Sequence, residues 1–184
     1  MDGVDYLDYY NDEHYLLDKV GPRFRKTGNL EPSDFLMILV WKANRAVGHH
    51  IKRLQERGEC SFNEAVSRIA QSLHSCTRPK EKLQLLITKW WFALPTATAI
   101  LTILYPEEFT VYDVIVCEEL KHKYRPQLYA SDSPWEEYEA YQAKVLSTAP
   151  SELSLRDKDR WLTGHHYYEW LKKKELELGC ASGA

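Results

Sequence analysis

Asp113 is the residue in this sequence that is best placed to do chemistry. It follows the segment FTVY and immediately precedes the apolar run VIVCEEL. A carboxylate with a pKa of about 4 is ionised at neutral pH, so it can stabilise positive charge that develops during a reaction. An aspartate just before an apolar helix is also a good N-cap, because its side chain accepts hydrogen bonds from the free amides of the first turn. The sequence leaves both interpretations open, catalyst and helix cap.

Basic residues gather in two segments that could meet phosphate groups. Residues 49–53 read HHIKR, with Arg57 following at helical spacing, and residues 121–125 read KHKYR. Cationic side chains bind phosphates, but they are also favoured at helix C-termini by the helix dipole. The second segment is the better phosphate candidate, because the predicted helix before it carries Asp113. It contributes three candidate contacts: Lys121, Lys123 and Arg125.

Motifs for metals and nucleotide cofactors are missing. The pairs His49-His50 and His165-His166 are adjacent residues, which point to different faces of a helix, and neither has a partner at the spacing of H-E-x-x-H. The four cysteines are scattered without a C-x-x-C pair. No glycine-rich phosphate loop and no serine or cysteine nucleophile context occurs. We therefore predict that the protein binds no metal ion and no cofactor, nucleotide cofactors included.

The segment WWFALPTATAILTILYPEEFTVYDV resembles the core motif of the helix-hairpin-helix DNA glycosylase superfamily, the endonuclease III-like fold. In that family a hairpin of the form Leu-Pro-Gly-Val-Gly-x-Lys-Thr-Ala opens a helix, and a catalytic aspartate follows in a Val-Asp context. The family's Thr-Ala falls on Thr96-Ala97, its lysine on Pro95, and its two glycines on Trp91 and Ala93. The aspartate falls on Asp113, 18 residues after Pro95, which is the family's spacing. The motif covers residues 85–122.

A second resemblance is to a group of small bacterial proteins of unassigned role. It rests on the segment from Trp41-Lys42 to Arg45, together with PTATAIL.

The glycosylase resemblance implies double-stranded DNA as partner, Asp113 as catalyst, and backbone contacts from the turn containing Trp91, Ala93 and Thr96. The departures from the motif limit the chemistry. Left-handed backbone is costly for residues with a side chain, so Trp91 and Ala93 suit a phosphate-binding hairpin poorly. Pro95 removes the amine that forms a Schiff base, so no lyase activity is expected. A monofunctional glycosylase remains, in which Asp113 stabilises charge on the sugar of a flipped-out nucleotide.

Helical patterns dominate the elements that must position these residues, and no stretch alternates long enough to indicate a sheet. Gly21-Pro22 is a turn signal after a first helix, and the helix that begins near Pro32 should end or bend near Gly48. Two capping boxes, Ser61 to Glu64 and Ser133 to Glu136, predict helix starts. We expect helices over residues 6–17, 32–48, 96–104, 111–120 and 155–178, and three more that begin at 61, 79 and 133. The helix from 79 should bury Leu83, Leu86, Ile87 and Trp90. The helix over 155–178 should place Trp161, Leu162, Tyr168 and Leu171 in the core.

These elements predict an all-α orthogonal multi-helix array resembling the helix-hairpin-helix glycosylase fold. We expect one helical domain over residues 1–184, with the Asp-bearing core at 85–122 and a frayed tail at 179–184. The longest apolar run, residues 90–104, is too short to cross a bilayer, and the acidic, aromatic N-terminus is unlike a targeting segment. The expected location is the cytoplasm.

Two functions follow from this sequence. The first is a DNA-binding protein related to base-excision glycosylases. The second is a non-catalytic helical interaction module whose hairpin has been rebuilt as hydrophobic core, which the net charge of −3 favours.

Overall fold

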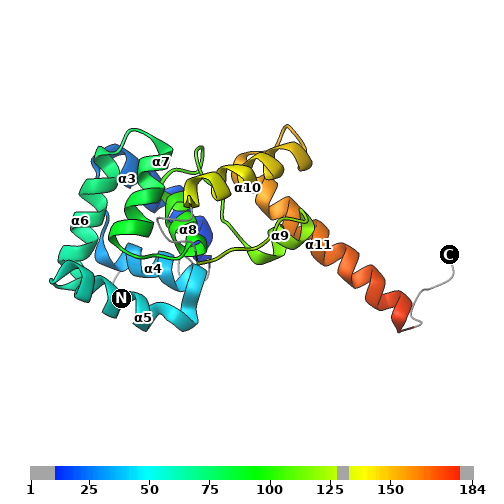
Figure 1. Ribbon diagram of the computed structural model, residues 1–184, viewed down its shortest axis with the longest axis horizontal. Helices are drawn as coiled ribbons and strands as arrows, with labels where there is room; N and C mark the ends of the chain where they lie inside the picture. Colours follow the sequence, from blue (N-terminus) through cyan, green and yellow to red (C-terminus); the bar gives the residue numbers. More distant parts are fainter. Residues whose placement is uncertain (1–10, 128–132, 179–184) are drawn as a thin grey trace, which may run out of the picture.

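The computed structural model describes residues 11–127 and 133–178, and within those ranges it contains helices and connecting segments but no strand. The predicted all-α class is therefore confirmed. The predicted tail at 179–184 and the start of the predicted 6–17 helix lie outside the described residues. Figure 1 shows the α-helices in chain order: α2 (Asp12–Tyr15), α3 (Gly21–Thr27), α4 (Pro32–Ala43), α5 (Val47–Gly58), α6 (Phe62–Ser75), α7 (Pro79–Gln84), α8 (Leu94–Leu104), α9 (Val114–Glu119), α10 (Pro134–Thr148) and α11 (Leu155–Glu177).

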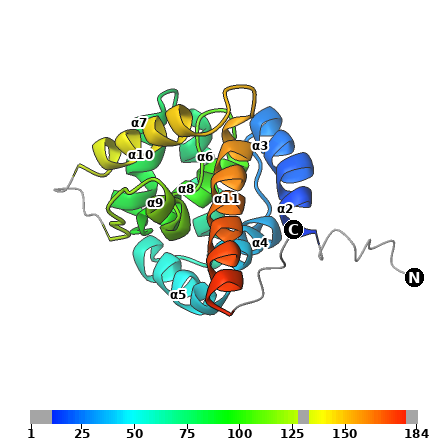
Figure 2. The same ribbon diagram turned by 90° about the vertical axis from the view of Figure 1, so that its right-hand side faces the viewer.

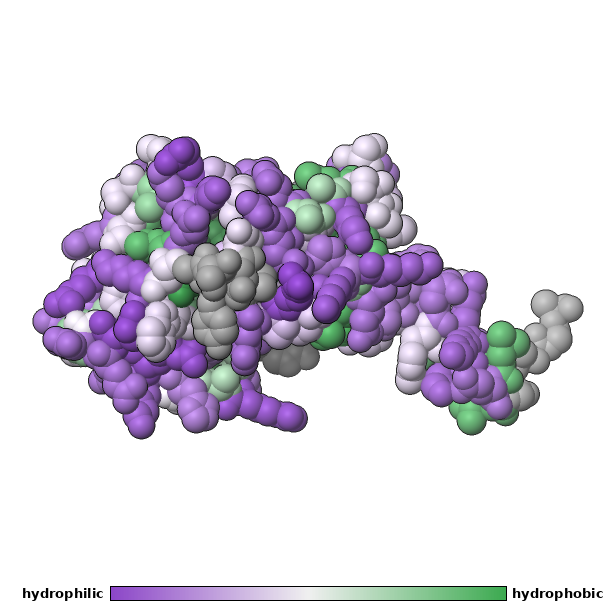
Figure 3. All heavy atoms as spheres, in the orientation of Figure 1, coloured by the Kyte–Doolittle hydropathy of each residue, from purple (hydrophilic) through white to green (hydrophobic). Residues whose placement is uncertain are grey.

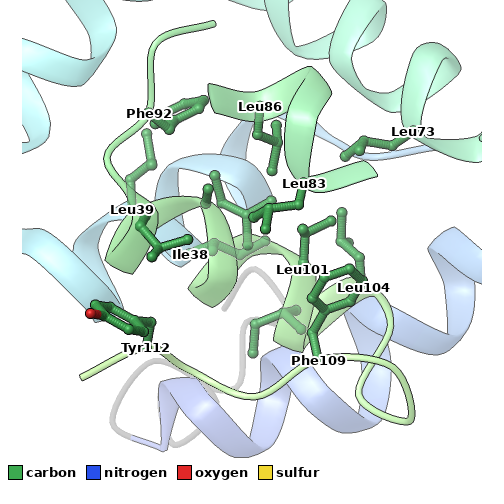
Figure 4. Close-up of a cluster of buried hydrophobic side chains, with 14 of the residues drawn as sticks. Ile38, Leu39, Leu73, Leu83, Leu86, Phe92, Leu101, Leu104, Phe109 and Tyr112 are labelled. Carbon is green, nitrogen blue, oxygen red and sulfur yellow. The ribbon is translucent and has the colours of Figure 1, made fainter. Parts of the chain in front are cut away.

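Helix α8 forms the centre of the core, and every one of its residues is buried. A helix that is apolar on all sides must be surrounded by other elements, and α3, α4 and α7 all contact it. Its two buried threonines at 98 and 102 satisfy their hydroxyls by donating to the carbonyls of Leu94 (2.9 Å) and Thr98 (2.8 Å). Figure 4 shows Leu101 and Leu104 of α8 among side chains from α4, α6 and α7. The helix that follows the predicted hairpin is thus buried along its whole length.

The N-terminal helix continues through the predicted turn at Gly21-Pro22, so that prediction is wrong. A π-helical segment, Leu16–Val20, joins α2 to α3, and Pro22 lies in the first turn of α3. Pro22 has no amide to donate, and the wider π-helical turn before it, in which the Gly21 amide donates to the Leu16 carbonyl, accommodates this break in the helical hydrogen-bond pattern. Gly21 has a packing role instead: a Cβ at this position would lie 2.3 Å from the Ile103 carbonyl oxygen of α8.

Helices α4 and α5 are separated by a bend just before Gly48. A 3-10 turn at Asn44–Ala46 joins them, and α5 then continues to Gly58. The predicted capping box at Ser61 and Glu64 is present, with both reciprocal hydrogen bonds formed. The predicted stripe on α7 and the following π-helical segment Leu85–Lys89 is also confirmed, since Leu83, Leu86, Ile87 and Trp90 are all buried.

The predicted capping box at Ser133 does not form. Ser133 has a left-handed backbone (φ 53°) and its side chain makes no capping hydrogen bond, although α10 begins at Pro134 as predicted. An N-cap normally needs an extended backbone to aim its hydroxyl at the first-turn amides.

Helix α11 packs on α9 and α10 through its N-terminal half and then projects from the body (Figures 1 and 2). Of its four predicted core residues only Leu162 is buried; Trp161, Tyr168 and Leu171 are exposed. Green atoms gather at the projecting tip in Figure 3, and the exposed leucines nearest the end of α11 in the sequence are Leu176 and Leu178. Within the described ranges, no helix combines the length and the hydropathy needed to cross a bilayer.

Candidate functional site

Asp113 is the N-cap of α9. Its backbone is extended (φ −125°, ψ 146°), which suits an N-cap whose side chain reaches the amides of the first turn. Its Oδ1 accepts a hydrogen bond from the Ile115 amide at 2.9 Å. The capping interaction that the sequence allowed is therefore present, and α9 begins three residues later than position 111.

Lys42 of α4 holds the other oxygen of Asp113. Its Nζ lies 2.6 Å from Oδ2, and the two side chains are only 17% and 30% exposed. Burial alone would raise the pKa of Asp113, but the Lys42 ammonium and the Ile115 amide together outweigh burial and lower that pKa. Asp113 is thus a carboxylate that is ionised and paired at neutral pH. In the sequence Lys42 belongs only to the second resemblance, and no local pattern around it indicates that it meets Asp113.

A partly buried charge network on α11 lies beyond this pair. Arg156 donates to Asp159 and to Glu13 of α2, the latter at 2.7 Å, and its guanidinium lies 5.5 Å from the Trp41 ring. Burial raises the pKa of Asp159, although the Arg156 cation opposes that effect. These contacts link α2, α4 and α11 beside Asp113. The charged residues around Asp113 therefore stabilise the packing of these helices.

The turn before α8 keeps the left-handed residue of a hairpin without its glycine. Trp91, at the first glycine position of the motif, has φ 57°, whereas Ala93 is extended. Two arginines of α5 hold this costly conformation: Arg53 donates to the Trp91 carbonyl at 2.7 Å, and the Arg57 guanidinium lies 3.7 Å from the centre of the Trp91 ring. Trp90 is buried in the core, whereas Trp91 is 54% exposed.

The start of α8 offers few backbone amides to a phosphate. The Leu94 amide donates to the Pro126 carbonyl at 3.0 Å, Pro95 has no N–H, and the Thr96 amide points to the Ala93 carbonyl at 3.0 Å. Any anion at this end of α8 must therefore be bound by side chains, and the nearest cationic ones belong to α5.

A pocket of about 930 Å³ lies between α5 and this turn. Three predicted DNA contacts line it, namely Trp91, Ala93 and Thr96. The pocket also receives five basic side chains of α5: His49, His50, Lys52, Arg53 and Arg57. Glu56 is the acidic residue of the lining, and it lies 3.7 Å from Lys52. The first basic segment of the sequence thus meets the turn, a pairing for which the sequence held no signal.

His50 is the most buried of these basic residues, with 7% of its surface exposed. Its ring lies 5.5 Å from that of Phe92, and its Nδ1 has no hydrogen-bond partner. Burial, followed by the charges of Arg53 and His49, lowers the pKa of His50. The imidazole is therefore neutral at physiological pH and carries unused hydrogen-bonding capacity beside the pocket.

The other predicted site residues do not line this pocket: neither Asp113 nor the 121–125 segment contributes to it. Tyr112 anchors that segment, since its hydroxyl donates to the Lys123 carbonyl (3.3 Å) and accepts from the Arg125 amide (2.8 Å). The Arg125 guanidinium lies 3.7 Å from the Glu137 carboxylate. Lys121 and Lys123 are exposed. The predicted DNA contacts are thus divided between two places.

In the described part of the chain, no cluster of three or more His, Cys, Asp or Glu side chains is arranged to hold a metal ion. Burial raises the pKa of the Cys117 thiol to about 12, which removes it as a nucleophile at neutral pH. Comparison of the chain with protein-family models, with curated proteins and with solved structures finds no match.

Proposed function

We propose that this protein binds DNA through the surface formed by α5 and the turn at residues 90–96, on a fold related to the helix-hairpin-helix glycosylases. The observation that carries the proposal is the pocket in which Trp91, held by Arg53 and Arg57, meets the basic side chains of α5. Exposed cations next to an exposed aromatic ring are the combination that binds a phosphate backbone and stacks on bases. The net charge of −3 means that this local surface must supply the attraction.

Base excision by Asp113 is the second candidate function. Its lowered pKa keeps the carboxylate ionised, as stabilising positive charge on a sugar requires. Lys42 neutralises much of that charge, and both oxygens already accept hydrogen bonds. We therefore place DNA binding first and base release second. Release of a damaged base by the wild type, abolished in Asp113→Asn, would support the second candidate.

The test of DNA binding is fluorescence anisotropy with a labelled duplex that carries an abasic-site analogue, beside an undamaged duplex, over a salt series. We expect binding that weakens steeply with salt, because bound phosphates release their counterions. Lys52→Glu should weaken it about tenfold or more and reduce the salt slope by about 1. Lys80→Glu, the same charge change on an exposed lysine of α7 outside the pocket, is the matched control.

Equal effects of Lys52→Glu and Lys80→Glu would show that only net charge matters and would overturn the proposed surface. Absence of binding to either duplex would favour the non-catalytic interaction module, and the search would move to protein partners.

A further inference from the structure

A duplex backbone alone does not account for the pocket beside Trp91. Phosphates on a duplex meet an outer cationic surface, whereas here the cations of α5 line one side of a concavity of about 930 Å³ that is also lined by an aromatic ring and a buried imidazole. Pockets of a few hundred to about 1,000 Å³ hold small ligands. We propose that this pocket binds one unpaired nucleotide, with its base on Trp91 and its 5′-phosphate among the basic side chains of α5. The inference rests on the proposed DNA-binding function and names the part of DNA that the site recognises.

Trp91 is suited to stack on a base. The residue is 54% exposed and lines the pocket, and the Arg57 guanidinium lies 3.7 Å from the centre of its ring, which holds the indole in place. Stacking of a base on an aromatic ring tolerates any base, since each has a π face. A tryptophan kept at φ 57° is a costly arrangement of the kind that occurs at ligand sites.

The phosphate position follows from the α5 cations. Arg53 uses one N–H on the Trp91 carbonyl at 2.7 Å, which fixes its guanidinium beside the turn while other N–H donors remain. Lys52, the residue before Arg53, and His49, one turn before it, are both exposed, and the ion pair of Lys52 with Glu56 is loose at 3.7 Å. A phosphate can therefore take over Lys52 without disrupting a buried pair.

His50 provides a polar contact in an otherwise apolar part of the lining. Its Nδ1 lacks a partner, and its side chain lies against Phe92 between the turn and α5. A base carries donors and acceptors along its edge that can meet such a nitrogen, whereas inorganic phosphate fills neither the ring surface of Trp91 nor the space beside His50.

The test is to titrate the full chain separately with deoxyadenosine 5′-monophosphate, deoxyadenosine and inorganic phosphate. Binding is measured by calorimetry and by tryptophan fluorescence. We expect the monophosphate to bind at least tenfold more tightly than either part alone and to quench fluorescence. Trp91→Gly, which suits the positive φ, should lose at least tenfold in affinity. Trp170→Leu, which removes an equally exposed tryptophan on α11, should leave affinity unchanged.

Monophosphate binding no tighter than that of inorganic phosphate would overturn the inference, and so would Trp91→Gly with wild-type affinity. A second variant, His50→Phe, keeps a ring against Phe92 and tests the pocket independently in case Trp91→Gly fails to fold. We expect it to weaken binding of the monophosphate and to leave binding of inorganic phosphate unchanged.

A duplex with a short single-stranded overhang, compared with the blunt duplex, identifies the source of the nucleotide. Tighter binding of the overhang, lost in Trp91→Gly, is the expected result. Salt-dependent binding of both duplexes without monophosphate binding would overturn the pocket inference and leave DNA binding intact. Monophosphate binding without binding of either duplex would instead overturn the DNA function and leave a free-nucleotide site.

Discussion

Lys42 and Asp113 are 71 positions apart in the chain, yet their side chains are joined by a 2.6 Å hydrogen bond. The pair links the end of α4 to the first turn of α9, and Asp113 at the same time caps α9 through the Ile115 amide. One carboxylate thus holds together two helices, so the residue that the glycosylase resemblance proposes as catalyst has a clear structural task.

Replacing Lys42 by Met should lower the free energy of unfolding by on the order of 1–3 kcal/mol at pH 7, since it removes a charge-assisted hydrogen bond. The pKa of Asp113 is lower in the folded protein than in the unfolded chain, so this stabilisation is present above about pH 4 and is lost as pH falls through the folded pKa. Urea unfolding of wild type and Lys42→Met at pH 7, 5 and 3.5 measures it. A difference that stays the same at all three pH values would contradict the assignment.

Trp91→Gly should cost less stability than Trp91→Ala. Alanine retains the cost of a left-handed backbone, roughly 1 kcal/mol, which glycine does not carry, and both lose the contact with Arg57. Thermal unfolding of the two variants compares them directly. Equal stability would mean that the turn relaxes to a negative φ once the indole is gone.

Gly21→Ala should be strongly destabilising, by several kcal/mol, because the new methyl group would lie 2.3 Å from the Ile103 carbonyl oxygen in the buried α8 backbone. Gly164→Ala is the matched control: a Cβ there meets nothing within 4 Å, and it lies in the middle of α11. The control should stabilise the protein by about 0.5–1 kcal/mol through helix propensity. Denaturant unfolding with equal m-values would establish both effects.

Tyr138→Phe should destabilise the protein by about 1–3 kcal/mol. The Tyr138 hydroxyl accepts from the Thr110 amide at 2.8 Å and donates to the Thr110 carbonyl at 3.1 Å. Its removal therefore leaves the buried amide and carbonyl of Thr110 without these hydrogen bonds. Tyr168→Phe on the exposed part of α11 should be close to neutral. Comparable losses in both variants would show that the Thr110 contacts carry little stability.

Some local signals in the sequence predicted local structure, whereas the equally local capping-box pattern at Ser133 does not form its hydrogen bonds. The Ser61–Glu64 capping box and the buried stripe from Leu83 to Trp90 depend on residues within one or two turns, and both are present. The cap at Asp113 is of the same kind. Such patterns work because the groups that satisfy each other are neighbours along the chain.

Features that depend on distant partners were not predictable. Gly21-Pro22 reads as a turn because nothing nearby shows that Gly21 packs against the Ile103 carbonyl of α8. Trp91 takes a left-handed backbone because Arg53 and Arg57 of α5 hold it there. The aromatic residues of α11 have a core-like spacing, but the rest of the fold ends before it can cover them. Whether the fold is that of the glycosylases stays a prediction.

The hydrogen bond between Glu13 and Arg156 joins residues 143 positions apart, so it can form only after most of the chain has been synthesised. On a ribosome that adds 5–20 residues per second, Glu13 waits on the order of ten seconds before Arg156 is synthesised. During that interval the first helix of the nascent chain can already meet α8, but the clamp from α11 does not yet exist. Until α11 is made, α2 therefore lacks the Glu13–Arg156 contact, so this link between α2 and α11 can form only late in synthesis.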